Sequence, residues 1–150
     1  MQLYKNFCKE TTDENGKLTS FELVFPENYN FGYDVVDKMA ELVPNDTAVV
    51  WTNPEKEEKI FTYSDISRLS NKAANVFRNH GIKKGDKVAI LLMNCLEWLP
   101  IYFGILKAGA IAVQLNYRYT ADEIKYCLEL AEADVLVFGP EFIGRVEEIS

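Results

Sequence analysis

The stretch from residue 104 to residue 138 constrains the fold more than any other part of the chain. It reads in order as the end of a helix, a short apolar strand, a polar turn, a capped helix and a second apolar strand. A strand, a helix and another strand in so short a segment predict one crossover unit of a parallel sheet. The polar turn, residues 116–119, leaves the carboxyl end of a strand and enters a helix, which is where open α/β sheets bind anionic ligands. We therefore expect a ligand site at this turn.

The helix after the turn has a clear start. Thr120 and Glu123 form a capping-box pattern, in which the hydroxyl accepts from the amide of Glu123 and the carboxylate accepts from the amide of Thr120. The helix is predicted to begin at Ala121 and to bury one stripe at a 3.6-residue spacing, made by Ile124, Cys127, Leu128 and Ala131. Asp134 then opens a strand at residues 135–138, so we expect this helix to lie on a sheet.

The rest of the chain after residue 30 predicts more elements of the same kind. In order, these are a helix that stops before Pro44, a hairpin of strands 48–51 and 59–63, a helix from Ser64 to His80 ended by Gly81, a strand 88–92, a helix 96–106 capped by Asn94 and ended by Gly109, a strand 111–113 and a last helix 141–150. The helix from Ser64 is expected to bury Ile66, Leu69, Ala73, Val76 and Phe77. This order predicts an α/β fold, a three-layer, mostly parallel sheet with crossover helices on its faces and an initial β-hairpin.

The two ends of the chain differ in pattern. Residues 1–30 are polar and weakly patterned, with a turn at residues 13–16. We interpret residues 1–30 as an N-terminal arm and residues 31–150 as the first part of a larger N-terminal α/β domain. The apolar stretch 98–115 is not expected to span a membrane, because it is divided into a buried helix, a turn and a strand by Pro100, Gly104, Lys107 and Gly109.

The charge balance narrows the possible partners. The formal net charge is -7, whereas nucleic acids and anionic membranes both recruit an excess of Lys and Arg, so we expect neither as a partner. Cys8, Cys95 and Cys127 lack metal-ligand spacing, and their odd number argues against a disulfide framework. The amino terminus also lacks the apolar core of a signal peptide. Together these features predict a cytoplasmic protein.

Common catalytic signatures are missing from the sequence. It contains no GxGxxG, GxxxxGKS/T, GxSxG or HExxH pattern. His80 is the only histidine and falls in the last turn of a predicted helix, where an imidazolium favours the helix dipole. Glu55, Glu57 and Glu58 are interleaved with lysines, which is typical of a solvated loop. The sequence therefore predicts no catalytic and no metal-ligating residue.

A family resemblance rests on three segments: residues 29–51, which begin YNFGYDVVDKM, residues 59–92, KIFTYSDISRLSNKAANVFRNHGIKKGDKVAILL, and residues 105–124, ILKAGAIAVQLNYRYTADEI. They resemble the opening of an acyl-CoA synthetase of the adenylate-forming, AMP-binding superfamily. The most similar group is that of the medium-chain and acetyl-CoA synthetases. The resemblance covers residues 29–140 in order, and its LKAG element is specific.

The resemblance implies an AMP-forming ligase that uses ATP, magnesium and coenzyme A to activate a small-molecule carboxylate, from acetate to a medium-chain acid, in fatty acid metabolism. It implies that the phosphate loop, the carboxylate pocket and the catalytic lysine follow residue 150. The chain would then be a truncated N-terminal fragment, inactive alone and with none of these cofactors bound. The alternative is a noncatalytic α/β interaction or oligomerisation module. Self-association is expected of the isolated fragment, since uncovered sheet edges pair with other chains.

The same resemblance implies site residues. Asn116, Tyr117 and Arg118 would border the coenzyme A nucleotide, and Arg145 is the nearest candidate to reach its phosphate. Each residue has a plainer alternative. Arg118 is equally consistent with an exposed turn arginine whose stem covers Tyr119. Asn116 would then close the turn through its side chain, Tyr117 would pack, and Arg145 would be a surface helix residue.

Overall fold

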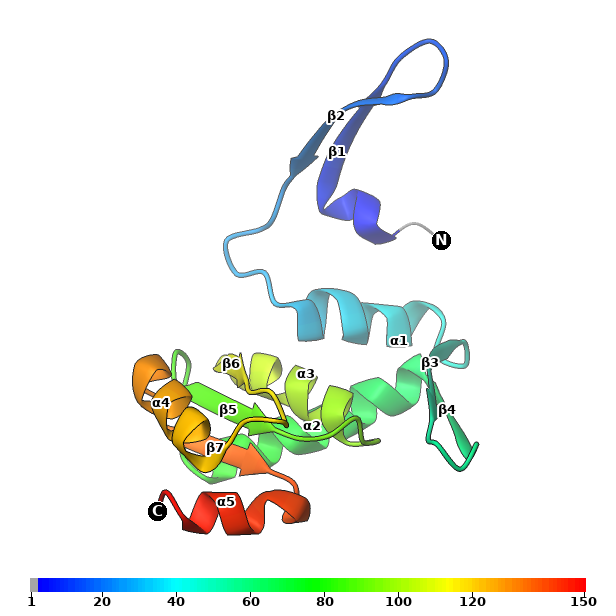
Figure 1. The fold of residues 1–150 in the computed structure, drawn as a ribbon. Helices are drawn as coiled ribbons and strands as arrows, with labels where there is room; N and C mark the ends of the chain where they lie inside the picture. The colour runs from blue at the N-terminus through cyan, green and yellow to red at the C-terminus, as the bar shows by residue number, and fades with distance from the viewer. Residues whose placement is uncertain (1–2) are drawn as a thin grey trace. The chain divides into compact units, whose positions relative to one another are not determined.

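The computed structural model describes residues 3–150. The chain divides into two compact units, one up to Asn30 and one from Phe31 onward, and each is described by itself (Figure 1). The first unit is a β-hairpin. A 3₁₀ helix, η1 (Leu3–Asn6), precedes strands β1 (Cys8–Thr12) and β2 (Leu18–Leu23), which pair antiparallel.

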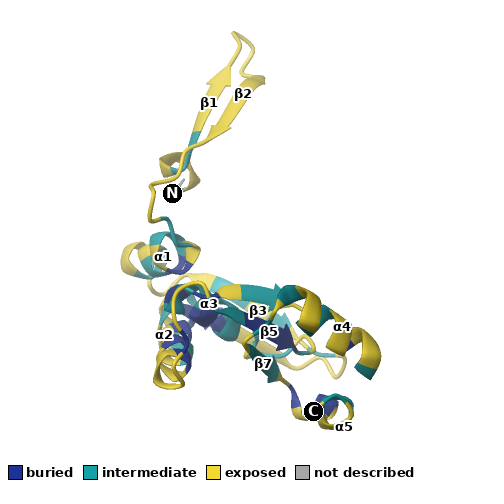
Figure 2. Cartoon of the chain, turned by 90° about the vertical axis from the view of Figure 1, so that its left-hand side faces the viewer, coloured by how far each residue is buried: buried dark blue, intermediate teal, exposed yellow. Residues whose placement is uncertain are grey.

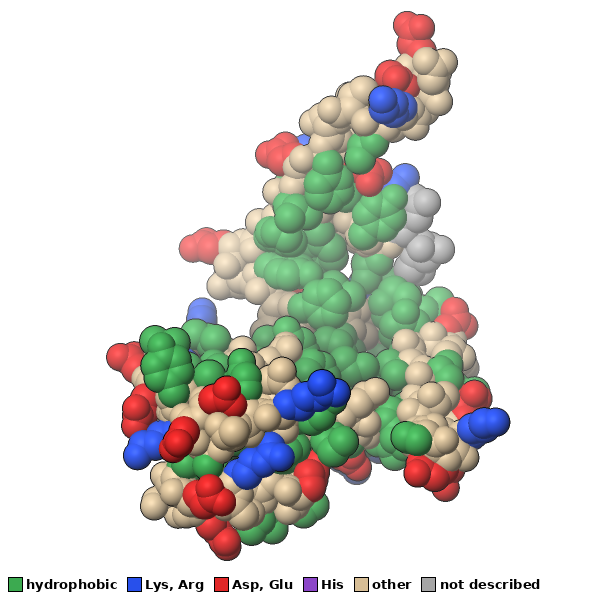
Figure 3. All heavy atoms as spheres, in the orientation of Figure 1, with side chains coloured by type: hydrophobic (Ala, Val, Ile, Leu, Met, Phe, Trp, Pro, Cys, Tyr) green, Lys and Arg blue, Asp and Glu red, His purple; other side chains and the backbone are tan. Residues whose placement is uncertain are grey.

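The turn of this hairpin is the one predicted at residues 13–16. Asp13 Oδ1 accepts from the backbone amides of Asn15 at 3.0 Å and Lys17 at 2.9 Å, and Gly16 has a φ of 77°. The two strands were not predicted, because nearly all their residues are exposed and no alternating burial marks them (Figure 2). Polar and charged side chains cover the tip of the hairpin, whereas hydrophobic ones gather toward its open end (Figure 3).

The second unit opens with a helix that changes pitch. The π-helix η2 (Gly32–Asp37) continues as α1 (Lys38–Leu42), which ends before Pro44 as predicted. Strands β3 (Thr47–Thr52) and β4 (Glu58–Thr62) then form the predicted antiparallel hairpin, which is a two-stranded sheet of its own.

The N-cap of helix α2 (Tyr63–Asn79) differs from the predicted one. It is Thr62, not Ser64: Thr62 Oγ1 accepts from the Asp65 amide at 3.1 Å, and Asp65 Oδ2 accepts from the Thr62 amide at 3.2 Å. A capping box needs an acidic or amide side chain three residues after the cap. Thr62 has Asp65 at that position, whereas Ser64 has Ser67.

Three parallel strands form the central sheet. They are β5 (Lys87–Leu91), β6 (Ile111–Gln114) and β7 (Val135–Phe138), in the order β6-β5-β7. The connections are α3 (Trp98–Ala108), between β5 and β6, and α4 (Ala121–Ala131), between β6 and β7. A short 3₁₀ helix, η3 (Pro140–Phe142), and α5 (Ile143–Glu147) follow β7, where one helix was predicted.

The sheet has a hydrophobic core on both faces. One core comprises Val88 and Ile90 of β5 with Phe77 of α2 and Ile105 of α3; the other comprises Ala89 and Leu91 of β5 with Ile124 of α4 and Phe142 of η3. Because alternate residues of a strand point to opposite faces, α2 and α3 cover one face of the sheet and α4 and η3 cover the other. The predicted three-layer α/β fold is confirmed, and residues 88–91 of β5 are each at most 1% exposed (Figure 2).

Helices α2 and α3 pack unusually close together. A Cβ atom added at Gly104 of α3 would lie 2.5 Å from the Cβ of Ala73, so the contact requires glycine. Small residues of α2, Ser70 and Ala74, are buried on this face. Val76 was predicted to be buried but is 54% exposed, because it lies roughly 140° around the helix from the face through Ser70 and Ala74.

Helix α3 also begins later than predicted. Its N-cap is Glu97, with no side-chain cap bond, so Asn94 is not the cap. Pro100 lies in the first turn, where its missing amide costs no intrahelical bond, and Gly104 lies inside the helix. Only Gly109, with a φ of 83°, ends the helix. Over residues 3–150, no helix has both the length and the hydropathy that crossing a membrane requires.

Candidate functional site

The carboxyl edge of the central sheet brings three loops together. They follow β5, β6 and β7, and the first two open from neighbouring strands toward opposite faces, since α3 and α4 lie on opposite sides of the sheet. Such a reversal leaves a crevice at the carboxyl ends of the strands, where open α/β sheets bind ligands. The predicted site residues Asn116, Tyr117 and Arg118 lie directly after β6 at this edge.

Asn116 closes the turn after β6. Its Oδ1 accepts from the Arg118 amide at 3.0 Å, and its backbone carbonyl accepts from the Tyr119 amide at 3.0 Å. Leu115, just before it, is buried and donates its amide to the carbonyl of Ile90 at 2.9 Å, which continues the ladder between β6 and β5. The turn is therefore anchored to the sheet at one end and closed by an asparagine side chain.

Arg118 is exposed at the tip of this turn. Its Nε lies 3.2 Å from Tyr117 Oη, and its guanidinium carbon is 5.5 Å from the centre of the Tyr117 ring. The arginine therefore lies along Tyr117, whereas the plainer alternative had its stem cover Tyr119. Among residues 3–150 no carboxylate forms an ion pair with Arg118. Its positive charge is open to an anionic ligand.

Arg145 is brought to the same turn from α5. Its Nη1 donates to the carbonyl of Tyr117 at 2.8 Å and to that of Tyr119 at 2.9 Å. Its guanidinium carbon lies 5.5 Å from the centre of the Phe142 ring. The structure thus brings all four predicted site residues together, although Arg145 is half-buried and bonded to the turn.

The start of α4 contributes little positive potential to this site. The predicted capping box is confirmed: Thr120 Oγ1 accepts from the Glu123 amide at 3.4 Å, and Glu123 Oε2 accepts from the Thr120 amide at 2.8 Å. Asp122 and Glu123 both lie in the first turn. Since these carboxylates already complement the helix dipole, the exposed positive charge of this turn is that of Arg118.

The loop after β5 borders a cavity that the sequence did not indicate. Its volume is about 200 Å³, and it lies between the β3–β4 hairpin and the start of α3. Trp51 Nε1 donates to the Asn94 carbonyl at 3.1 Å across this region. Burial raises the pKa of the Cys95 thiol, which also lines the cavity, so this thiol is a poor nucleophile at neutral pH.

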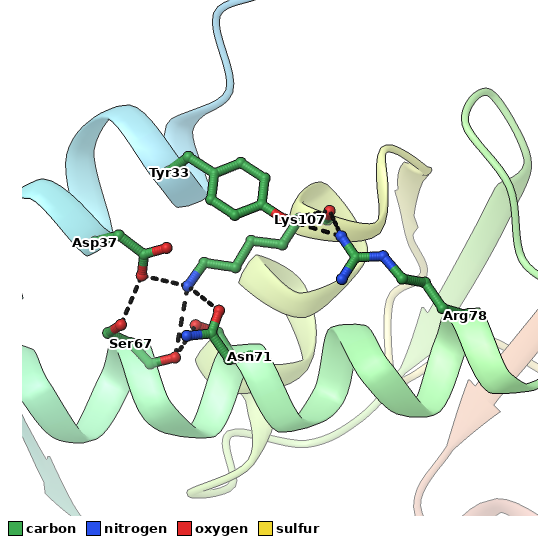
Figure 4. Close-up of polar contacts among 7 residues, drawn as sticks. Tyr33, Asp37, Ser67, Asn71, Arg78 and Lys107 are labelled. Carbon is green, nitrogen blue, oxygen red and sulfur yellow. Dashed lines mark hydrogen bonds and ion pairs between the residues drawn. The ribbon is translucent and has the colours of Figure 1, made fainter.

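A buried lysine of α3 points toward η2 and α2 (Figure 4). The Lys107 side chain is 0% exposed, and its Nζ pairs with Asp37 Oδ1 at 2.5 Å and donates to Asn71 Oδ1 at 2.9 Å. Arg78 Nη2 donates to the Lys107 carbonyl at 2.5 Å and to Tyr33 Oη at 2.8 Å. The sequence analysis did not predict this network. The signal available in the sequence is Lys107 itself, a charged residue inside an apolar helix, because a buried charge needs partners.

His80 and Glu57 take part in local hydrogen bonds. His80 Nδ1 lies 2.8 Å from the carbonyl of Val76 at the end of α2, and Glu57 Oε2 accepts from the Asn53 side-chain amide at 2.7 Å in the β3–β4 turn. Across the described part of the chain, residues 3–150, no group of three or more His, Cys, Asp or Glu side chains has the arrangement of a metal site.

The chain matches a known protein family and proteins of known kind. The model of a family described as AMP-binding enzyme matches residues 36–149. A crotonobetaine/carnitine–CoA ligase of Salmonella paratyphi A is 34% identical over 113 residues, which are 75% of this chain and 22% of that protein. The corresponding ligase of Proteus mirabilis is 35% identical over 106 residues, 71% of this chain and 20% of that protein.

Solved structures show the same fold. A fatty acyl CoA synthetase of Mycobacterium tuberculosis superposes with a TM-score of 0.72 and 30% identity, over 80% of this chain and 23% of that one. An anthranilate CoA ligase in complex with anthranoyl-AMP gives a TM-score of 0.73 and 30% identity, over 83% of this chain and 23% of that one. The chain thus spans less than a quarter of the length of each of these four proteins.

Proposed function

Because the chain belongs to the family of AMP-binding enzymes, we propose that it forms the N-terminal part of an ATP-dependent, AMP-forming acyl-CoA ligase. The family match over residues 36–149 carries this proposal, and the CoA ligases and synthetases among its relatives support it. The proposed substrate is a small carboxylate, from acetate to a medium-chain acid, used in fatty acid metabolism. The proposed location is the cytoplasm.

The proposed reaction has two steps. A carboxylate oxygen attacks the α-phosphorus of ATP, and the bond to pyrophosphate breaks to give an acyl adenylate. The sulfur of coenzyme A then attacks the acyl carbon and loses its proton, while AMP leaves with the electron pair of the acyl–oxygen bond. Both steps depend on positioning the reactants and on stabilising negative charge.

Arg118 fits a contact with coenzyme A. Its guanidinium is exposed at the carboxyl edge of the sheet and pairs with no carboxylate of residues 3–150. A guanidinium presents planar donors that match phosphate oxygens, which coenzyme A carries on its nucleotide. Asn116 would fix the turn, and Tyr117 would orient the arginine along its ring.

ATP and magnesium are not assigned to residues of this chain. The sequence has no glycine-rich phosphate loop of a known pattern, and residues 3–150 hold no carboxylate group arranged for a metal. Magnesium, when bound, would screen the charge of the phosphates. In the proposed ligase, residues outside positions 1–150 would hold both groups.

A second candidate is a noncatalytic interaction or oligomerisation module. It is favoured by a different observation: within residues 3–150, β6 and β7 each pair only with β5, so both are edge strands of the three-stranded sheet. Ile111 on β6 is 51% exposed, and Phe138 on β7 is 37% exposed. Exposed apolar edge strands favour pairing with another chain.

Activity of the full-length protein separates the two candidates. The ligase is expected to exchange pyrophosphate into ATP only when a carboxylate is added, and to release AMP only when coenzyme A is also present. Straight-chain acids from acetate to decanoate would define the substrate range. The 150-residue chain serves as the control and is expected to be inactive. A full-length protein without either activity would favour the module, and exchange by the 150-residue chain would contradict the assignment of ATP to other residues.

A further inference from the structure

Arg145 links the segment that follows β7 to the turn that follows β6, and these two strands flank β5. It lies on α5, after β7, and its Nη1 donates to the carbonyl oxygens of Tyr117 and Tyr119 in the turn after β6. We propose that Arg145 is a positioning residue: it holds this turn in the conformation that presents Arg118 to coenzyme A, and it does not bind coenzyme A itself. This inference rests on the proposed function.

The hydrogen bonds of the turn divide between Asn116 and Arg145. Asn116 accepts from the amides of Arg118 and Tyr119, at 3.0 Å in each case. The carbonyls of Tyr117 and Tyr119 accept from Arg145 at 2.8 Å and 2.9 Å. Because these two carbonyls lie on either side of Arg118 along the chain, one guanidinium fixes the backbone both before and after it.

Arg145 is itself held by the core. Its guanidinium carbon lies 5.5 Å from the centre of the Phe142 ring, and Phe142 is only 3% exposed. Phe142 belongs to the hydrophobic cluster that contains Ala89 and Leu91 of β5. The Arg145 guanidinium thus has one face against a buried ring and one edge bonded to backbone carbonyls. Arg118, by contrast, is exposed at the tip of the turn.

The position of α5 follows from the end of β7. The Gly139 amide donates to the Leu91 carbonyl at 3.1 Å, which keeps the chain beside β5 after β7 ends. Gly139 is the N-cap of η3, and Phe142, the last residue of η3, enters the core. Arg145 follows three residues later, on the first turn of α5. The sheet therefore determines where the Arg145 side chain meets the turn after β6.

A double-mutant cycle in the full-length ligase tests this role. The variants are Arg145→Met, Arg118→Ala and both together, and the KM for coenzyme A is measured in thioester formation. Methionine keeps an unbranched apolar stem over Phe142 but has no donor for the carbonyls. Pyrophosphate exchange reports adenylate formation separately. Lys125→Met, which removes an exposed charge from α4, is the matched control for loss of one positive charge.

Positioning predicts a specific pattern of results. Arg145→Met is expected to raise the KM for coenzyme A about 5-fold or more, because two hydrogen bonds to the turn are lost. It is expected to add nothing further in the Arg118→Ala background, since it acts through Arg118. Arg145→Lys keeps a donor of similar reach and is expected to return the KM toward the wild-type value. Lys125→Met is expected to leave the KM unchanged.

Other patterns would overturn the inference. Additive effects of Arg145→Met and Arg118→Ala would mean that Arg145 contacts coenzyme A directly, and an unchanged KM in Arg145→Met would mean that the turn does not need it. A lower melting temperature with loss of both half-reactions would make Arg145 a purely structural residue. If Arg118→Ala leaves the KM unchanged, or the wild type forms no thioester, the proposed function of the site fails first and the inference fails with it.

Discussion

Arg118 and Arg145 carry the same charge in different surroundings. Arg118 is exposed and lies along Tyr117, with no carboxylate partner among residues 3–150. Arg145 is half-buried and bonded to two backbone carbonyls. A charged group that is already bonded inside the protein has less to gain from a ligand than an exposed one, because its donors must first be released. The two arginines are therefore proposed to have different roles: Arg145 holds the turn, and Arg118 contacts the ligand.

Removing Arg118 is expected to weaken coenzyme A binding selectively. A charge-assisted hydrogen bond is worth roughly 1 to 3 kcal/mol, so Arg118→Ala should raise the KM for coenzyme A about 5-fold to 150-fold. Adenylate formation should be nearly unchanged, since that step uses other groups. Steady-state thioester formation and pyrophosphate exchange by the full-length protein measure the two effects. Equal loss of both activities would place Arg118 in the ATP site or make it structural.

Lys107 is expected to matter for stability. Replacing it with alanine leaves Asp37, whose side chain is only 24% exposed, without its cation, and breaking a buried ion pair typically costs about 3 to 5 kcal/mol. Because Asp37 keeps its bond from Ser67 Oγ at 2.6 Å, we expect Lys107→Ala to cost about 3 kcal/mol of the free energy of unfolding. Urea unfolding measures the loss, with the exposed Lys72→Ala of α2 as the control. A cost below about 1 kcal/mol would contradict a structural role for the pair.

The sequence predicted the four site residues but not the contacts that hold them or the Lys107–Asp37 pair. The four site residues were placed at one edge because strand ends and family resemblance both pointed there. The Lys107–Asp37 pair joins residues 70 positions apart, and no local pattern indicates such a partner. The two bonds from Arg145 to the turn also span 26 and 28 positions. Local signals find the loop that carries a site, whereas the contacts that hold it depend on tertiary packing.

At the scale of the elements, the α2–α3 contact depends on a missing side chain. At Gly104, an added Cβ would lie 2.5 Å from Ala73 Cβ and 3.0 Å from the Ala74 amide nitrogen, which is backbone and cannot rotate away. We expect Gly104→Ala to lower the free energy of unfolding by about 1 to 3 kcal/mol, despite the higher helix propensity of alanine. Gly144→Ala in α5 is the matched control, because nothing lies within 4 Å of its added Cβ. Equal stability of the two variants would contradict the close contact.

The capping box of α2 makes stability depend on pH. The Thr62 amide, the Thr62 hydroxyl and Arg68 together lower the pKa of Asp65 below its ordinary value. A carboxyl group whose pKa falls on folding stabilises the protein above its unfolded pKa of about 3.9, and loses that contribution as the pH falls through the folded value. Asp65→Asn is therefore expected to be less stable than the wild type at pH 7, by a margin that shrinks below about pH 4. Urea unfolding at pH 7 and pH 3 would show a constant margin if Asp65 were not involved.

The two capped helices also show where sequence patterns succeed. Thr120 was predicted as a cap because Glu123 follows at the required spacing, and the structure confirms both bonds. The cap of α2 was placed at Ser64 because the preceding strand was expected to extend to Tyr63. The same spacing rule identifies Thr62 once Asp65 is taken into account. By contrast, β1 and β2 gave no signal, since their residues are nearly all exposed.

At the scale of the whole chain, the second unit leaves its sheet open at both sides. The strand order β6-β5-β7 gives two edge strands, and the crotonobetaine/carnitine–CoA ligase and the fatty acyl CoA synthetase are each more than four times as long as the part that this chain matches. Large apolar side chains are also exposed on α4, where Tyr126 is 63% and Leu130 is 71% exposed. Exposed edges and apolar side chains of this kind mark surfaces that other polypeptide segments cover.

The 150-residue chain is therefore expected to self-associate. Ile111, 51% exposed on edge strand β6, is the test position, because a lysine there opposes pairing of the edge with another chain. Sedimentation velocity across a concentration series should show oligomers for the wild type and a shift toward monomer for Ile111→Lys. Val76→Lys is the matched control, since Val76 is similarly exposed, at 54%, but lies on helix α2 and not on an edge strand. A wild-type chain that stays monomeric at high concentration would contradict this prediction. An equal effect of Ile111→Lys and Val76→Lys would mean that the chain associates through exposed apolar side chains in general and not through pairing of the β6 edge.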